Sequence, residues 1–143
     1  MDQKDIDAIV SGVAKLIKPK AKLELSGELD LYGPMVATSS IVTAATAECP
    51  EDEWWHVDIF CGSDNNSISS GSLKLAKRRT RVEETNDVEV GFQANPTGGT
   101  IYFSNSSFWV FPGQKLVAVF TGAAAGDKLE LWATGRRHKV SKE

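Results

Sequence analysis

The chain has 143 residues, of which 41% are hydrophobic and 24% are charged, and its formal net charge is −3. This composition is typical of a folded globular protein, and the length predicts one domain with a short appended segment. Net acidity argues against a general nucleic-acid binder. No run approaches the ~18 consecutive apolar residues of a membrane span, and the acidic start at residues 1–5 does not resemble a secretory signal. We therefore expect neither membrane partners nor a signal peptide.

The first part of the chain has the period of an α-helix. Six aliphatic residues recur at helical spacing and share one face: Ile6, Ile9, Val10, Val13, Leu16 and Ile17. Pro19 ends the pattern. An isolated helix of ~15 residues is marginal in water, so this face must be buried on its own domain, on a second copy or on another protein. Residues 1–22 are predicted to be an amphipathic helical arm and link that docks on a partner.

From Leu23 onward the hydrophobic period changes to two, which indicates β-strands. Gly27 marks a candidate bulge in the first segment. The predicted strands, separated by clusters of turn residues, are 23–31, 36–47, 54–61, 72–76, 80–84, 88–94, 100–104, 108–111, 115–121 and 128–133. Short strands at this spacing predict a mainly β fold, an antiparallel β-sandwich with jelly-roll-like topology, over residues 23–135. Residues 136–143 are predicted to be a basic, solvated C-terminal tail.

The chain offers little material for chemistry. Cys49 and Cys61 are expected to be reduced thiols, and they match no familiar zinc spacing with His56. His56 and Asp58 share a strand face, but the sequence has no Gly-x-Ser-x-Gly turn for a nucleophile. We expect no metal, no cofactor and no enzymatic activity. A hydrolase that uses His56 and the acidic loops is the weaker alternative.

Two features indicate an interaction surface. Trp54-Trp55 and Phe108-Trp109 are adjacent aromatic pairs, so one member of each pair faces outward in a regular strand. Trp54 and Trp109 are the candidates, and an outward Trp serves either as a protein interface anchor or as a sugar-stacking platform.

The second feature is a basic segment. Alternating Lys77, Arg79 and Arg81 would line one side of an edge strand. There they would discourage unwanted strand pairing or meet acidic loops of a neighbouring copy. Nucleic-acid binding by this segment is less favoured.

The segment 111–131 resembles the closing hairpin of small virion β-sandwiches. It contains a Pro112-Gly113 turn, a strand and a Gly126-Asp127 turn, which leads into a last strand that ends in Gly135. The acidic helix and its Lys- and Ala-rich link resemble the arms of tailed-phage structural proteins.

This resemblance implies a non-enzymatic virion structural protein, of the kind that decorates or cements a phage capsid. It implies a homo-oligomer, often a trimer, that is made in the host cytoplasm and binds the major capsid protein or another virion protein. Because jelly-roll hairpins also occur in carbohydrate-binding modules, a glycan-binding module that uses the exposed Trp residues is the alternative.

Overall fold

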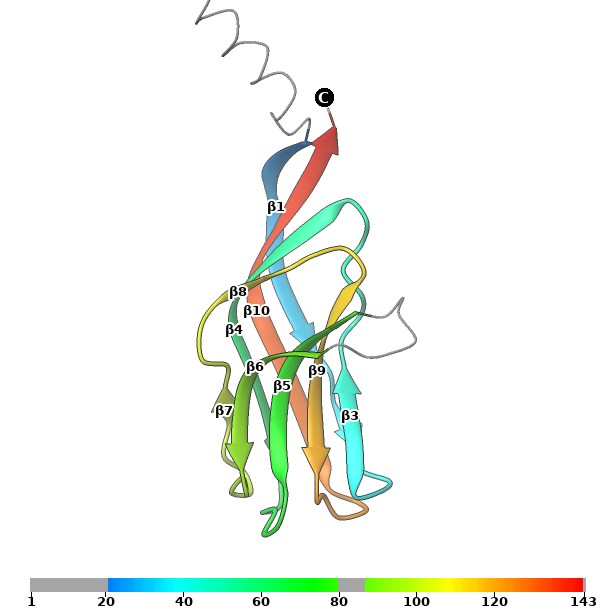
Figure 1. The fold of residues 1–143 in the computed structure, drawn as a ribbon, viewed down its shortest axis with the longest axis vertical. Coiled ribbons are helices and arrows are strands. Elements are labelled where there is room, and N and C mark those ends of the chain that lie inside the picture. Colours follow the sequence, from blue (N-terminus) through cyan, green and yellow to red (C-terminus); the bar gives the residue numbers. More distant parts are fainter. Residues whose placement is uncertain (1–20, 80–86, 143) are drawn as a thin grey trace, which may run out of the picture.

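The computed structural model describes residues 21–79 and 87–142. Within these ranges the chain forms two antiparallel sheets that pack face to face, so the predicted mainly β sandwich is confirmed (Figure 1). The predicted helical arm, with all six residues of its apolar face, lies outside the described residues, as does the strand predicted at 80–84.

Each sheet is built from strands that are distant in sequence. Sheet A has the order β1 (Ala21–Tyr32), β10 (Lys128–Lys142), β4 (Glu53–Asp64) and β7 (Tyr102–Phe103), with β2 (Met35–Val36) paired to β10 and β8 (Phe108–Val110) paired to β4. Sheet B has the order β3 (Ile41–Ala45), β9 (Gln114–Thr121), β5 (Ser72–Arg79) and β6 (Asp87–Ala94). The face of each sheet that points away from the other sheet is called its outer face below.

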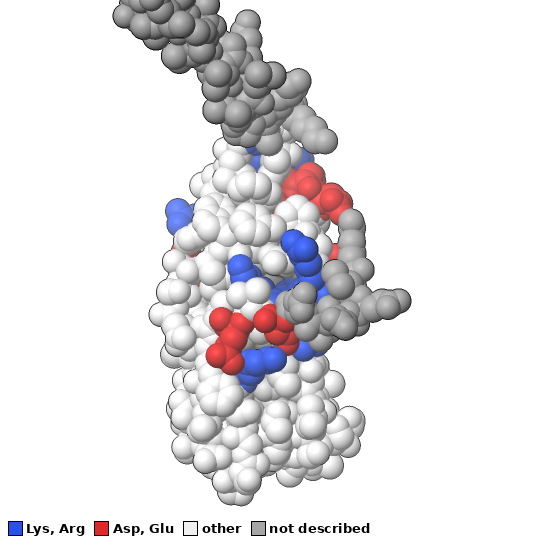
Figure 2. All heavy atoms as spheres, in the orientation of Figure 1, with Lys and Arg blue, Asp and Glu red and all other residues white. Residues whose placement is uncertain are grey.

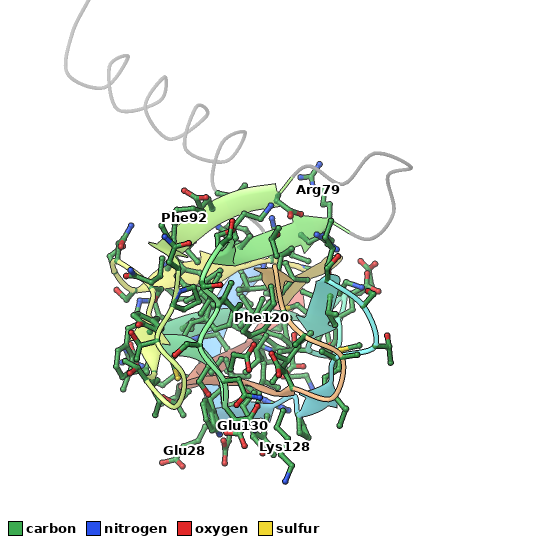
Figure 3. All side chains as sticks on the ribbon, turned by 90° about the horizontal axis from the view of Figure 1, so that it is seen from below. Glu28, Arg79, Phe92, Phe120, Lys128 and Glu130 are labelled. Atoms are coloured by element: carbon green, nitrogen blue, oxygen red, sulfur yellow. The ribbon has the colours of Figure 1, made fainter. Side chains whose placement is uncertain are left out.

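The core lies between the two sheets and follows the alternation of the sequence. Leu129 and Leu131 of β10 and Phe60 of β4 are fully buried from one side, and Leu75 of β5 and Phe120 of β9 from the other. Figure 3 shows Phe120 between the two layers. Each such side chain contributes about 1.5–3 kcal/mol when it is fully buried, which makes this layer the main source of stability.

The structure confirms the bulge predicted at Gly27. The pairing of β1 with β10 shifts register between Leu25 and Gly27, so Ser26 is the extra residue.

A second bulge was not predicted and reverses the alternation of β4. The pairing of β10 with β4 shifts between Thr134 and Gly135, which leaves Asp58 unpaired on β4. Val57 before this bulge and Phe60 after it are fully buried, whereas Ile59 is 49% exposed. In a regular strand, the alternation of 54–61 would place Ile59 and Cys61 on the face of Trp55, and the bulge places both on the opposite face.

Three other predictions about the organisation of the sandwich need correction. β1 begins at Ala21, which pairs with Lys142, so residues 21–22 belong to the sheet and not to the link. β10 continues to Lys142, so a solvated tail over 136–143 is wrong for residues 136–142. β5 lies between β9 and β6, so Lys77 and Arg79 are on an inner strand and not on an edge.

Candidate functional site

Trp54 and Trp109 lie together on the outer face of sheet A. Trp54 is on β4 and Trp109 on β8, and both are half-buried. Their ring centroids are 6.3 Å apart in an edge-to-face arrangement. Three further rings complete a group that we call the aromatic cluster: Trp54, His56, Trp109, Phe111 and His138.

Strand register explains why these five rings meet. His56 is the cross-strand partner of Trp109, and Trp54 is the partner of His138. The ring of His56 lies 4.8 Å from that of Trp109, and the ring of His138 lies 5.1 Å from it. Phe111 follows β8 and meets Trp54 edge-on at 5.0 Å. Because each aromatic pair contributes ~0.5–1.5 kcal/mol beyond its buried area, the cluster holds a fixed shape.

A short polar network borders the cluster. His56 Nδ1 lies 2.9 Å from Asp58 Oδ1, so the polar pair expected from the sequence is present. Arg136 Nη2 lies 3.4 Å from the same nitrogen and 3.8 Å from Asp58 Oδ1. His138 Nδ1 is buried and has no hydrogen-bond partner among the described residues. Among the described residues, no serine or cysteine is hydrogen-bonded to His56. The carboxylate partner of His56 in these ranges is Asp58.

Lys77 joins the cluster from the opposite sheet. Its Nζ donates a 2.9 Å hydrogen bond to the backbone carbonyl of Trp109. The same nitrogen lies 5.7 Å from the ring centroid of Phe108 and 6.0 Å from that of Phe111. Burial lowers the pKa of Lys77. Lys77 therefore ties β5 to β8 and positions Trp109, a role that spacing alone did not predict.

The other two basic candidates are Arg79 and Arg81. Arg79 is exposed at the end of β5, on sheet B, and Arg81 lies outside the described residues. The structure thus brings together Trp54, Trp109 and Lys77.

Sequence reasoning missed a second aromatic group on the outer face of sheet A. Tyr32, Trp132, Cys61 and Phe103 are successive cross-strand partners on β1, β10, β4 and β7. Tyr32 and Phe103 are 54% and 58% exposed. A signal was present, because Trp132 alternates with the buried residues Leu131 and Ala133 and so stands on the polar side of its strand.

Two buried carboxyl groups lie at one end of the sandwich. Asp64 and Asp127 are 2% and 3% exposed. Asn66 connects them, since its backbone N–H donates to Asp64 at 2.9 Å and its Nδ2 donates to Asp127 at 2.7 Å. Burial, together with the neighbouring Asp127, raises the pKa of Asp64 to about 6. These hydrogen bonds indicate that Asp64 and Asp127 hold neighbouring loops together.

Cys49 and Cys61 are both buried free thiols, and burial raises the pKa of Cys49 to about 12. In residues 21–79 and 87–142, no three His, Cys, Asp or Glu side chains gather as metal ligands. The same described ranges contain no apolar helix of membrane-spanning length.

Comparison with known proteins does not extend these observations. No model of a known protein family matches the chain, and no curated protein sequence matches it.

Proposed function

We propose that this protein is a non-enzymatic virion structural protein that decorates or cements a phage capsid as a homo-oligomer, most simply a trimer. The observation that carries the proposal is the aromatic cluster, a preformed group of large rings on one face of a rigid sandwich. Aromatic residues are enriched at the centres of protein interfaces, where they supply most of the binding energy.

The order of the strands supports a finer, jelly-roll assignment of the fold. The chain passes from one sheet to the other between β2 and β3, β3 and β4, β4 and β5, β6 and β7, β8 and β9, and β9 and β10. Of the longer strands, only β5 and β6 are consecutive neighbours in one sheet. Two sheets wrapped in this way are typical of jelly rolls, which occur in viral capsid and lectin domains.

The arm gives the proposed subunit a second means of assembly. β1 begins at Ala21 on one edge of sheet A, so residues 1–20 are attached directly to the sheet that carries the aromatic cluster. The sequence predicts an apolar helical face there. In a closed homo-oligomer every copy would offer the same arm and the same surface. The proposed partners are a second copy of this chain and the major capsid protein or another virion protein.

The glycan-binding alternative through Trp54 or Trp109 has weaker support. A sugar stacks on the flat face of an aromatic ring, whereas each of these rings is engaged edge-to-face by neighbouring rings. The cluster therefore suits an apolar protein surface better than a sugar ring.

Light scattering on the full chain and on residues 21–143 tests this function. We expect a trimer or a larger closed ring for the full chain. If the truncated protein is a folded monomer, the arm is the assembly element. If it keeps the same oligomeric state, the sandwich assembles itself and the arm is free for the capsid. A monomeric full chain at micromolar concentration would contradict the proposal.

A further inference from the structure

A shallow hollow lies beside Trp132, apart from the aromatic cluster. It has a volume of about 250 Å³. Its lining combines one aromatic ring, one aliphatic side chain and several polar groups: Trp132, Ile101, Ser63, Asn65, Lys128 and Glu130. Clefts for drug-sized ligands measure ~300–1,000 Å³, so this hollow is suited to one small ring.

The ring of Trp132 is held in place from one side. Tyr32 stacks on it with a centroid distance of 5.7 Å and an interplanar angle of 28°. Tyr32 is on β1, whereas Ser63 is on β4, and these two strands lie on opposite sides of β10. The hollow therefore lies on the side of Trp132 that Tyr32 does not cover.

The polar groups are positioned by the backbone. Asn65 Oδ1 accepts a 2.7 Å hydrogen bond from the Lys128 N–H, and the Asn65 N–H donates to the Lys128 carbonyl at 3.0 Å. These bonds fix the Asn65 side chain at the border of the hollow. Glu130 adds a carboxylate acceptor, one that also interacts with the Tyr32 hydroxyl, and Lys128 adds an ammonium donor. Figure 3 shows the side chains of Lys128 and Glu130 projecting from the same layer.

A pyranose has the complementary chemistry. Its C–H face is apolar and packs on an aromatic ring, while its neighbouring hydroxyls each donate and accept hydrogen bonds. An aromatic wall with a few converging donors and acceptors is the usual composition of a small-molecule site. We propose that the hollow beside Trp132 binds a single pyranose ring of a glycan, with the ring stacked on Trp132 and its hydroxyls bound by Asn65, Lys128 and Glu130. This function is separate from assembly through the aromatic cluster.

Saturation-transfer NMR on the full chain tests this inference with methyl glycosides of glucose, galactose, mannose and N-acetylglucosamine. Isothermal titration then measures the affinity of those that bind. We expect at least one sugar to bind with a millimolar dissociation constant. Glu130→Gln should weaken binding severalfold and Trp132→Ala by at least tenfold. Since Trp132→Ala removes the stacking partner of Tyr32, Trp132→Phe is measured as well, and it should keep the fold and weaken binding less.

Phe92→Ala is the matched control, because Phe92 is a 56% exposed aromatic residue on sheet B, on the opposite layer from Glu130 (Figure 3). It should bind sugar as the unmodified protein does. The proposal would be overturned if none of the four glycosides binds at 10 mM. It would also be overturned if the folded Glu130→Gln and Trp132→Phe variants bind sugar as tightly as the unmodified protein.

Discussion

The outer face of sheet B carries charged side chains that pair with one another, whereas the outer face of sheet A carries aromatic rings. On sheet B, Asp87 of β6 binds Arg78 at 2.7 Å and Lys74 at 2.9 Å, both from β5. Figure 2 shows the resulting gathering of opposite charges near the middle of this face. On sheet A, the aromatic cluster and the row from Tyr32 to Phe103 present rings instead.

This difference indicates separate roles for the two faces. Charges that neutralise each other within one chain stabilise that chain and leave little for a partner. Burying an exposed aromatic ring against a partner is favourable, and contiguous apolar patches on a protein surface mark interaction sites. We therefore assign binding to sheet A and local stability to sheet B. The predictions below test this division.

The largest effect is expected from Gly135, whose place beside the β4 bulge shapes the outer face of sheet A. A Cβ atom at this position would lie 1.9 Å from the backbone carbonyl oxygen of His56. Because that contact involves backbone, the strands would have to separate. Gly135→Ala should lower the free energy of unfolding by ~3 kcal/mol or more, measured by urea denaturation. A loss below ~0.5 kcal/mol would contradict the bulge geometry.

The next effect concerns the pH dependence of stability at Asp64. Its folded pKa of about 6 lies above its unfolded value of ~3.9. The folded state therefore binds more protons between these values, so stability falls as the pH rises from about 4 to 6 and then levels off. Asp64→Asn resembles the protonated acid. It should be more stable than the unmodified protein above pH 6 by ~2 kcal/mol, and the difference should vanish below pH 4.

Urea denaturation from pH 3.5 to 8 measures this difference. If Asp64→Asn is instead less stable than the unmodified protein at pH 8, burial and the neighbouring Asp127 do not destabilise the charged form of Asp64.

Asp87 should show the opposite sign on sheet B. The Arg78 guanidinium, helped by Lys74, lowers the pKa of Asp87 to about 2. Because this is below the unfolded value, the carboxylate contributes stability above pH ~4, and the contribution is lost as the pH falls toward 2. Asp87→Asn should cost ~1–2 kcal/mol at pH 7 and progressively less in acid.

The same variant also tests the division between the faces. Asp87→Asn should leave the oligomeric state at pH 7 unchanged, as measured by sedimentation velocity. Dissociation of the assembly by this substitution would show that sheet B takes part in the interface.

Alternation of apolar residues was enough to predict the sandwich and most of its strands. Alternation does not encode strand order, which is why β5 was expected at an edge. It also fails where charged residues form a strand. Arg137 was assigned to a tail, yet its guanidinium lies 6.0 Å from the ring of buried Trp55 and 4.0 Å from Glu53.

The candidate site was predictable only in part. Adjacent aromatic residues identified Trp54 and Trp109, because one member of each pair must face outward. Their contacts with His138 and Lys77 depend on pairing between residues that are distant in sequence. The bulge at Asp58 places Cys61 in the row with Trp132. Because this bulge contains no glycine, no local pattern in the sequence predicted it.

The central claim is that the aromatic cluster on the outer face of sheet A mediates assembly, and the most direct test is the native mass of a double variant. Trp54→Ser with Trp109→Ser removes both indoles but keeps the Trp109 carbonyl that Lys77 binds. Phe92→Ser on sheet B is the control. We predict a closed oligomer for the unmodified protein and the control, and a folded monomer for the double variant. A folded double variant with the same mass as the unmodified protein would contradict the account.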